Sequence, residues 1–195
     1  MAPKFQICEH PLIQEKLAVL RDRRTPPEAF RVAMEEVGSL MGYEVLRNLK
    51  TRKSEVLTPL QKAPAQYVDQ PVALVAVLRA GLGFLPGLLR LSPAARIGHI
   101  GLYRNEETLN PVRYYVRLPK DIKNCFTVLL DPMLATGGSA VEAIHILKTD
   151  GARQICLLSL IASKAGVKRV HEAHPDVAIY SAGLDPVLNK KGYIV

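Results

Sequence analysis

The chain has 195 residues, 48% of them hydrophobic and 23% charged, which is typical of a packed globular protein and suggests one domain. No apolar run approaches the roughly 20 residues that span a bilayer, and residues 1–10 lack the apolar core of a signal peptide, so we expect a cytoplasmic protein. The net charge of +8 favours a polyanionic ligand, either a small molecule or a nucleic acid. Cys8, Cys125 and Cys156 are far apart in sequence and show no metal-ligand spacing.

The N-terminal quarter of the chain predicts two helices before any buried strand. Apolar residues recur at helical spacing over residues 10–22. Thr25-Pro26-Pro27-Glu28 is typical of a helix start with Thr25 as N-cap, and we expect that second helix to reach about Leu49. The pair could cover an edge of the sheet or form a dimer surface. Two weak strands are expected after it, at 54–58 and 66–68.

From Val72 onward, buried apolar runs alternate with helical patterns. This alternation predicts a doubly wound α/β fold with a mainly parallel sheet. The strands are expected at 72–78, 96–102, 126–130, 154–162 and 177–182, and the helices before Leu91, before Asp150 and over 164–173. The polar, turn-rich stretch after residue 102 is followed by an alternating strand. This pattern predicts a β-arm over 103–117 that projects from the sheet where a lid would be useful.

One strand-loop-helix stretch, residues 128–140, carries most of the chemical information. Its apolar strand ends at Asp131-Pro132, and Thr136-Gly137-Gly138-Ser139 leads directly into an amphipathic helix. Free N–H groups and the positive end of a helix dipole meet at such a turn. Ligands of open α/β sheets also lie at the carboxyl ends of strands. The stretch therefore predicts a phosphate-binding loop with one carboxylate directed at it, with an ordinary capped turn as the alternative.

A second strand tip carries a charged residue before glycines. Arg79 follows the apolar run that ends at Leu78 and precedes Gly81 and Gly83. Such an arginine is either solvated or faces a phosphate. The five histidines form no metal pattern, and we interpret His171 and His174, which share a helix face, as surface residues.

Residues 131–139 resemble the phosphoribosyl diphosphate (PRPP) signature of type I phosphoribosyltransferases. Most of that superfamily carries two adjacent acids, whereas this chain has Asp131 followed by Pro132, which resembles the uracil phosphoribosyltransferase family. Segments 78–82, 101–109 and 188–194 resemble the same family in order and spacing. The resemblance covers nearly the whole chain and implies a single phosphoribosyltransferase domain over 1–195.

The resemblance implies pyrimidine salvage: uracil and PRPP give UMP and diphosphate, by an oxocarbenium-like displacement of diphosphate with Mg²⁺. Asp131 would hold the ribose hydroxyls, and Arg79 and Arg104 would stabilise the leaving diphosphate. Mg²⁺ would be bound mainly through PRPP, with Asp131 reaching it through water. The implied PRPP-binding residues are Arg79, Arg104, Asp131, Pro132, Met133, Leu134, Ala135, Thr136, Gly137, Gly138 and Ser139.

The resemblance also implies a uracil-binding tail over 183–195, in which main-chain groups hold the base at Tyr193 and Ile194. Family members continue with a glycine- and aspartate-rich turn, whereas this sequence ends at Val195, so we expect the uracil side of the site to be incomplete. A homodimer or larger homo-oligomer, GTP as an allosteric activator and no nucleic-acid partner are further implications.

Three alternatives stay open at this point. The chain could transfer phosphoribosyl groups to another base, such as a purine. It could be a relative that binds RNA and regulates pyrimidine metabolism, which the basic charge allows. It could also be a structural partner in a hetero-oligomer, although Arg79, Arg104 and Asp131 are retained.

Overall fold

A central sheet of eight strands organises the molecule, and the computed structural model describes residues 5–104, 111–189 and 192–195. The strand order is β1-β10-β9-β7-β4-β5-β6, and the short β8 pairs with β9. All neighbours are parallel except β5 and β6, which confirms the mainly parallel sheet. The strands are β1 (Phe5–Ile7), β4 (Val72–Leu78), β5 (Arg96–Arg104), β6 (Pro111–Arg117), β7 (Phe126–Leu130), β8 (Met133–Leu134), β9 (Gln154–Ser163) and β10 (Ala178–Asp185).

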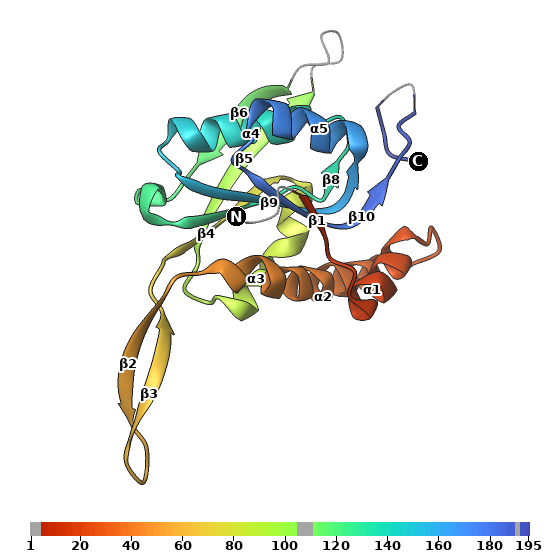
Figure 1. Ribbon diagram of the computed structural model, residues 1–195. Coiled ribbons are helices and arrows are strands. Elements are labelled where there is room, and N and C mark those ends of the chain that lie inside the picture. Colours follow the sequence, from red (N-terminus) through yellow and green to blue (C-terminus); the bar gives the residue numbers. More distant parts are fainter. Residues whose placement is uncertain (1–4, 105–110, 190–191) are drawn as a thin grey trace.

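Helices cover both faces of this sheet, as expected for a doubly wound fold (Figure 1). On one face lie α1 (Pro11–Arg21), α2 (Pro27–Val45) and α3 (Leu85–Leu91), and on the other lie α4 (Gly138–Thr149) and α5 (Lys164–Ala173). Single-turn 3-10 helices are η1 (Leu46–Asn48), η2 (Ala80–Phe84) and η3 (Ile122–Asn124). Each face of the sheet has its own hydrophobic core. Leu130 packs into the core beneath α1, α2 and α3, and Leu129 packs into the core beneath α4 and α5. Because both faces are buried, the central strands are continuous apolar runs.

The N-terminal helices cover a face of the sheet, so the expectation that they cover its edge was wrong. One edge of the sheet is formed by β1, a strand that the sequence did not reveal, which pairs in parallel with β10. The helix cap was misplaced by one residue. Pro26 is the N-cap of α2, and the Thr25 hydroxyl instead donates to the carbonyl of Val19 at 2.6 Å, which ties the two helices together.

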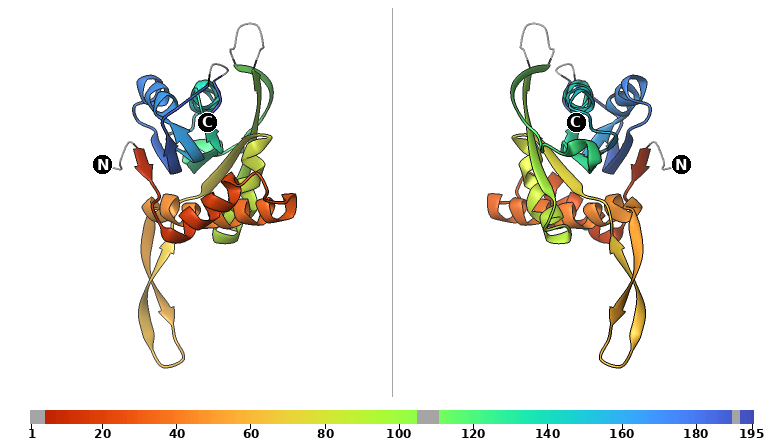
Figure 2. Two further views of the ribbon diagram at one scale, coloured as in Figure 1. Left: turned by 90° about the vertical axis from the view of Figure 1, so that its right-hand side faces the viewer. Right: turned by 90° about the vertical axis from the view of Figure 1, so that its left-hand side faces the viewer.

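The weak strands predicted around Pro59 form a long hairpin that projects from the body (Figures 1 and 2). Its strands, β2 (Thr51–Leu57) and β3 (Lys62–Val68), form a separate two-stranded antiparallel sheet. The predicted arm over 103–117 has its two strands in β5 and β6, whose antiparallel pairing extends to Arg104 and Pro111. Its connection, 105–110, lies outside the described residues.

Several polar groups are buried within the described residues. His174 is 8% exposed and its Nε2 lies 3.1 Å from the carbonyl of Val141, so its interpretation as a surface residue was wrong. Cys8, Cys125 and Cys156 are buried free thiols. Among the described helices, none is long and apolar enough to cross a membrane.

Candidate functional site

Parallel pairing brings the predicted site residues to one edge of the sheet. β7 lies between β4 and β9, with Leu130 opposite both Ala76 and Leu158. The carboxyl ends of β4 and β7 open into a common cleft of about 280 Å³, which lies at the position expected for ligands of such sheets. The residues that line it are Val77, Leu78, Arg79, Ala80, Leu102, Asp131, Met133, Leu134, Ala135, Thr136, Gly137, Gly138, Ser139, Ala140, Gly192 and Tyr193.

The loop between β7 and α4 forms the floor of this cleft, and we call residues 131–139 the cradle. Gly137 is the N-cap of α4 and has a left-handed φ of 78°, a conformation that favours glycine. The first turn of any helix leaves its N–H groups without intrahelical acceptors. The N–H of Ala135 already donates to the carbonyl of Met133 at 2.9 Å. The free donors for an anion therefore come from the start of α4, at Gly138 and Ser139, rather than from Ala135.

The junction of β9 and α5 fixes the cradle from behind, a contribution that the sequence reading missed. The Ser163 hydroxyl donates to the carbonyl of Ala135 at 2.5 Å and accepts from the N–H of Gly166 at 2.9 Å. A Cβ on Gly166 would lie 2.6 Å from the same carbonyl, so only glycine fits there. The available signal was Ser163 directly before the helix predicted over 164–173, because serine is a preferred N-cap residue.

Asp131 stands at the tip of β7, and its carboxylate is poorly solvated. Burial raises its pKa to about 6, although the N–H of Met133 donates to the carboxylate and opposes this effect. Among the residues that line the cleft, Asp131 is the one acidic side chain. A partly desolvated carboxylate with spare acceptor capacity is suited to receive hydroxyl groups or a hydrated cation.

Arg79 lines the same cleft as the cradle and follows immediately after β4. Its side chain is exposed, and no acidic group among the described residues forms an ion pair with it. The peptide bond between Leu78 and Arg79 is cis, and Arg79 is the N-cap of η2. Arg104 ends β5, where its backbone pairs with Pro111. The placement of the Arg104 side chain lies outside the described part of the structure.

The C-terminal tail reaches the same cleft. Gly192 and Tyr193 line it, and the Tyr193 side chain is 64% exposed. Ile194 behaves differently from Tyr193: it forms a backbone bridge with Leu188, and its side chain packs against the core beneath α1 and α2. Tyr193 thus lines the cleft, whereas the side chain of Ile194 packs against the core. The expected contact of their main-chain groups with uracil stays a prediction.

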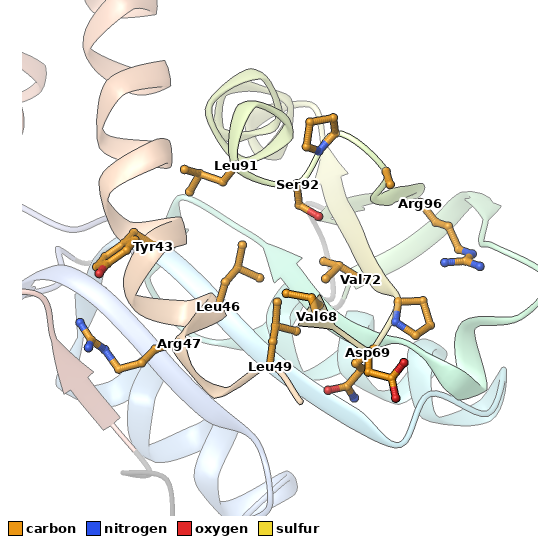
Figure 3. A pocket seen from close by; sticks show the side chains of 14 residues that line it. Tyr43, Leu46, Arg47, Leu49, Val68, Asp69, Val72, Leu91, Ser92 and Arg96 are labelled. Carbon is orange, nitrogen blue, oxygen red and sulfur yellow. The ribbon is translucent and has the colours of Figure 1, made fainter. Parts of the chain in front are cut away.

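A larger cavity of about 810 Å³ lies elsewhere (Figure 3). Apolar side chains including Leu46, Leu49 and Val68 line it, at the base of the β2–β3 hairpin. It also contains Val72 and Arg96, the first residues of β4 and β5. It therefore lies at the amino edge of the sheet, opposite the cradle, and lacks the phosphate-binding elements of the cleft.

Comparisons with known proteins agree with this site. The family model of uracil phosphoribosyltransferase matches residues 7–195. The chain belongs to the uracil phosphoribosyltransferase family. A uracil phosphoribosyltransferase of Clostridium kluyveri is 54% identical over 187 residues, which cover 95% of this chain and 90% of that protein. One of Anoxybacillus flavithermus is 50% identical, over 98% of this chain and 92% of its own length.

Solved structures show the same fold. A protein structure from Aquifex aeolicus superposes with a TM-score of 0.92 at 37% identity, covering 97% of this chain and 91% of its own. A hypoxanthine phosphoribosyltransferase from Trypanosoma cruzi has a TM-score of 0.51 at 16% identity, over 83% of this chain and 70% of its own, a likeness of fold alone. The phosphoribosyltransferase fold and family expected from the motifs are thus confirmed, and the alternative functions are not favoured.

The raised pKa of Asp131 predicts a pH dependence of PRPP use. Protonation removes the charge of the carboxylate and part of its acceptor capacity, so kcat/KM for PRPP should fall roughly tenfold per pH unit below about 6. The pH profile of Asp131→Asn is the control, because it retains the titration of the substrate phosphates and lacks that of the carboxylate. Identical profile shapes in the two proteins would contradict the assignment.

The same pKa predicts that Asp131 destabilises the ligand-free protein. Because the folded-state pKa is about 6 and the reference value is 3.8, the folded state binds the proton more tightly. The resulting stability is fully present below pH 3.8 and is lost as the pH rises through about 6. At pH 7, Asp131→Asn should therefore raise the free energy of unfolding by roughly 1–3 kcal/mol in urea denaturation, while turnover falls. A loss of stability would mean that the carboxylate is a structural group.

Proposed function

We propose that this chain transfers the phosphoribosyl group of PRPP to uracil, giving UMP and diphosphate. The observation that carries the proposal is that the cradle and Arg79 line one cleft at the carboxyl edge of the sheet. PRPP bears a phosphate at one end of its ribose and a diphosphate at the other, so a clamp with two anion-binding sides suits its shape. Membership of the uracil phosphoribosyltransferase family supports uracil as the acceptor.

In this proposal the cradle holds the ribose 5-phosphate. N–H groups at the start of α4 donate to the phosphate oxygens, together with the hydroxyls of Thr136 and Ser139. Asp131 accepts hydrogen bonds from the ribose hydroxyls. The backbone between these two contacts runs through Pro132, Met133 and Leu134. The pairing of β8 with β9 fixes its path.

Arg79 and Arg104 act on the leaving group. Negative charge gathers on diphosphate as its bond to the ribosyl carbon lengthens, and a guanidinium placed there stabilises that charge more in the transition state than in the ground state. Uracil then forms a bond to the ribosyl carbon, and no covalent intermediate forms on the enzyme. Gly192 and Tyr193 lie where the tail closes the cleft, and we assign this side to the base.

The residues present fit a magnesium ion carried by the substrate. The described residues contain no group of three or more His, Cys, Asp or Glu side chains that could hold a metal. Asp131 alone in the cleft could reach a cation through water, so most of the ligands would be oxygens of PRPP. Bound in this way, Mg²⁺ would neutralise charge on the departing diphosphate.

Four further proposals accompany this reaction. GTP acts as an allosteric activator. The protein works in the cytoplasm, which agrees with its three free, buried thiols. The region 1–195 acts as one catalytic domain, and nucleic acid is not a partner.

The reaction is tested by measuring UMP formation from uracil and PRPP, with hypoxanthine as the alternative acceptor. We expect turnover of uracil and none of hypoxanthine, and we expect chelation of Mg²⁺ to abolish the turnover of uracil. Arg79→Ala should lower the rate by about 10²–10³, the usual effect of removing one such stabilising donor. GTP added to the same assay should raise the rate. Turnover of hypoxanthine without turnover of uracil would overturn the proposal.

We also propose that the chain forms a homodimer through the β2–β3 hairpin. Leu57 and Leu60, near the tip of this arm, are 83% and 95% exposed. An isolated two-stranded hairpin is marginally stable in water, so a projecting arm with apolar residues at its end calls for a second packing surface. The outward face of α2, where Val32 is 55% exposed, is the other candidate interface, as the N-terminal helices were expected to be.

The double variant Leu57→Asp/Leu60→Asp should be monomeric where the parent chain is dimeric, because it places charges in an apolar contact. Light scattering across a concentration series measures the mass. Val32→Asp is the matched control and should stay dimeric. A monomeric parent chain, or dissociation by Val32→Asp with the arm variant still dimeric, would contradict the arm as the interface.

A further inference from the structure

Arg169, on the second turn of α5, lies beside the cradle although it is far from it in sequence. The two elements are in tight contact: a Cβ on Gly137 would lie 2.9 Å from the carbonyl of Gly166 and 3.3 Å from the Cβ of Arg169. The contact between Ser163 and Ala135 holds the same pair of elements together. The position of Arg169 relative to the cradle is therefore fixed by packing and does not depend on a flexible connection.

The guanidinium of Arg169 extends toward the first turn of α4. A Cβ built on Gly138 would lie 3.5 Å from Nη1 and 3.9 Å from Cζ of Arg169. The same point lies 3.9 Å from the hydroxyl oxygen of Thr136. Because residue 138 is glycine, no side chain fills this point. A cation and a hydroxyl thus face one open position at the N-terminus of α4.

This placement is electrostatically unfavourable unless an anion is present. A helix N-terminus carries the positive end of the helix dipole, and a cation beside it is destabilised. No acidic side chain among the described residues forms an ion pair with Arg169 that would offset this destabilisation. The nearby Glu172 on the same helix is paired with Lys168 at 3.7 Å. Arg169 therefore has no ion-pair partner among the described residues.

We propose that Arg169 binds the 5-phosphate of PRPP from the outer side of the cradle, an inference that rests on the cradle holding that phosphate. The remaining cradle donors are neutral N–H and hydroxyl groups, so Arg169 would supply the charged hydrogen bond of the subsite. The phosphate on the fifth carbon keeps its charge throughout the reaction. Arg169 therefore stabilises the ground state and the transition state equally, and it sets the KM for PRPP and the preference for a phosphorylated ribose.

Calorimetric titration with ribose 5-phosphate and, separately, with diphosphate tests this assignment. Arg169→Ala should weaken ribose 5-phosphate binding about tenfold or more, the usual effect of losing a charged hydrogen bond, and leave diphosphate binding unchanged. Arg169→Lys should recover part of the affinity. In steady state, Arg169→Ala should raise the KM for PRPP by a similar factor at constant kcat.

Lys168→Ala is the matched control, because it removes an equal charge from the preceding residue and should leave both affinities unchanged. Equal binding of ribose 5-phosphate by the parent chain and Arg169→Ala overturns the role of Arg169 alone. Equal weakening by Lys168→Ala and Arg169→Ala also overturns it, because the effect would then be one of net charge. Failure of the parent chain to bind ribose 5-phosphate overturns the cradle assignment itself.

Discussion

The parallel pairing of β7 between β4 and β9 is the constraint on which the site depends. In an open parallel sheet all carboxyl ends lie at one edge, and the loops that leave them share one space. Arg79 leaves β4, the cradle leaves β7, and Ser163 ends β9. Arg79 and Asp131, which are 52 positions apart in sequence, are therefore brought to one cleft by the pairing of their strands. The chemistry requires no separate scaffold.

The cradle combines a stabilising and a destabilising element. Ser163 and Gly166 fix its backbone through a hydroxyl hydrogen bond and a close backbone approach. Asp131 and the guanidinium of Arg169 do the opposite in the ligand-free protein, one by desolvation and the other by its position at a helix N-terminus. Both costs are relieved by the same ligand, because PRPP brings hydroxyls for the carboxylate and a phosphate for the cation. A site built in this way is expected to be less stable when empty.

Much of this arrangement could be predicted from the sequence, for identifiable reasons. β4 is an uninterrupted apolar run and β7 is interrupted only by Thr127, a pattern typical of strands buried on both faces. Residues 131–139 form a contiguous motif. Edge strand β1 could not be recognised, because three residues carry no period and the pairing with β10 is distant in the chain. The β2–β3 arm appeared shorter than it is because Pro59 and Pro64 lower strand propensity, although Pro64 is accommodated in a two-stranded sheet.

The side chains around the cradle also differ in how well the sequence predicts their positions. Arg79 directly follows a predicted strand, so its position at the edge of the sheet follows from local order. Arg169 lies on an amphipathic helix among other cations, and nothing in its neighbours along the chain distinguishes it from Lys168. Only the packing of α5 on the cradle, which depends on Gly137 and Gly166, separates the two. Sequence patterns identify least well those residues whose positions depend on tertiary contacts at glycines.

The central claim is that residues 131–139 hold the phosphorylated ribose. A crystal structure of the protein with UMP tests it most directly. We expect the UMP phosphate to accept hydrogen bonds of about 2.7–3.2 Å from N–H groups at the start of α4, and a ribose hydroxyl to lie at a similar distance from the Asp131 carboxylate. A UMP molecule bound in the apolar cavity at the base of the β2–β3 hairpin, with the cradle empty, would contradict it.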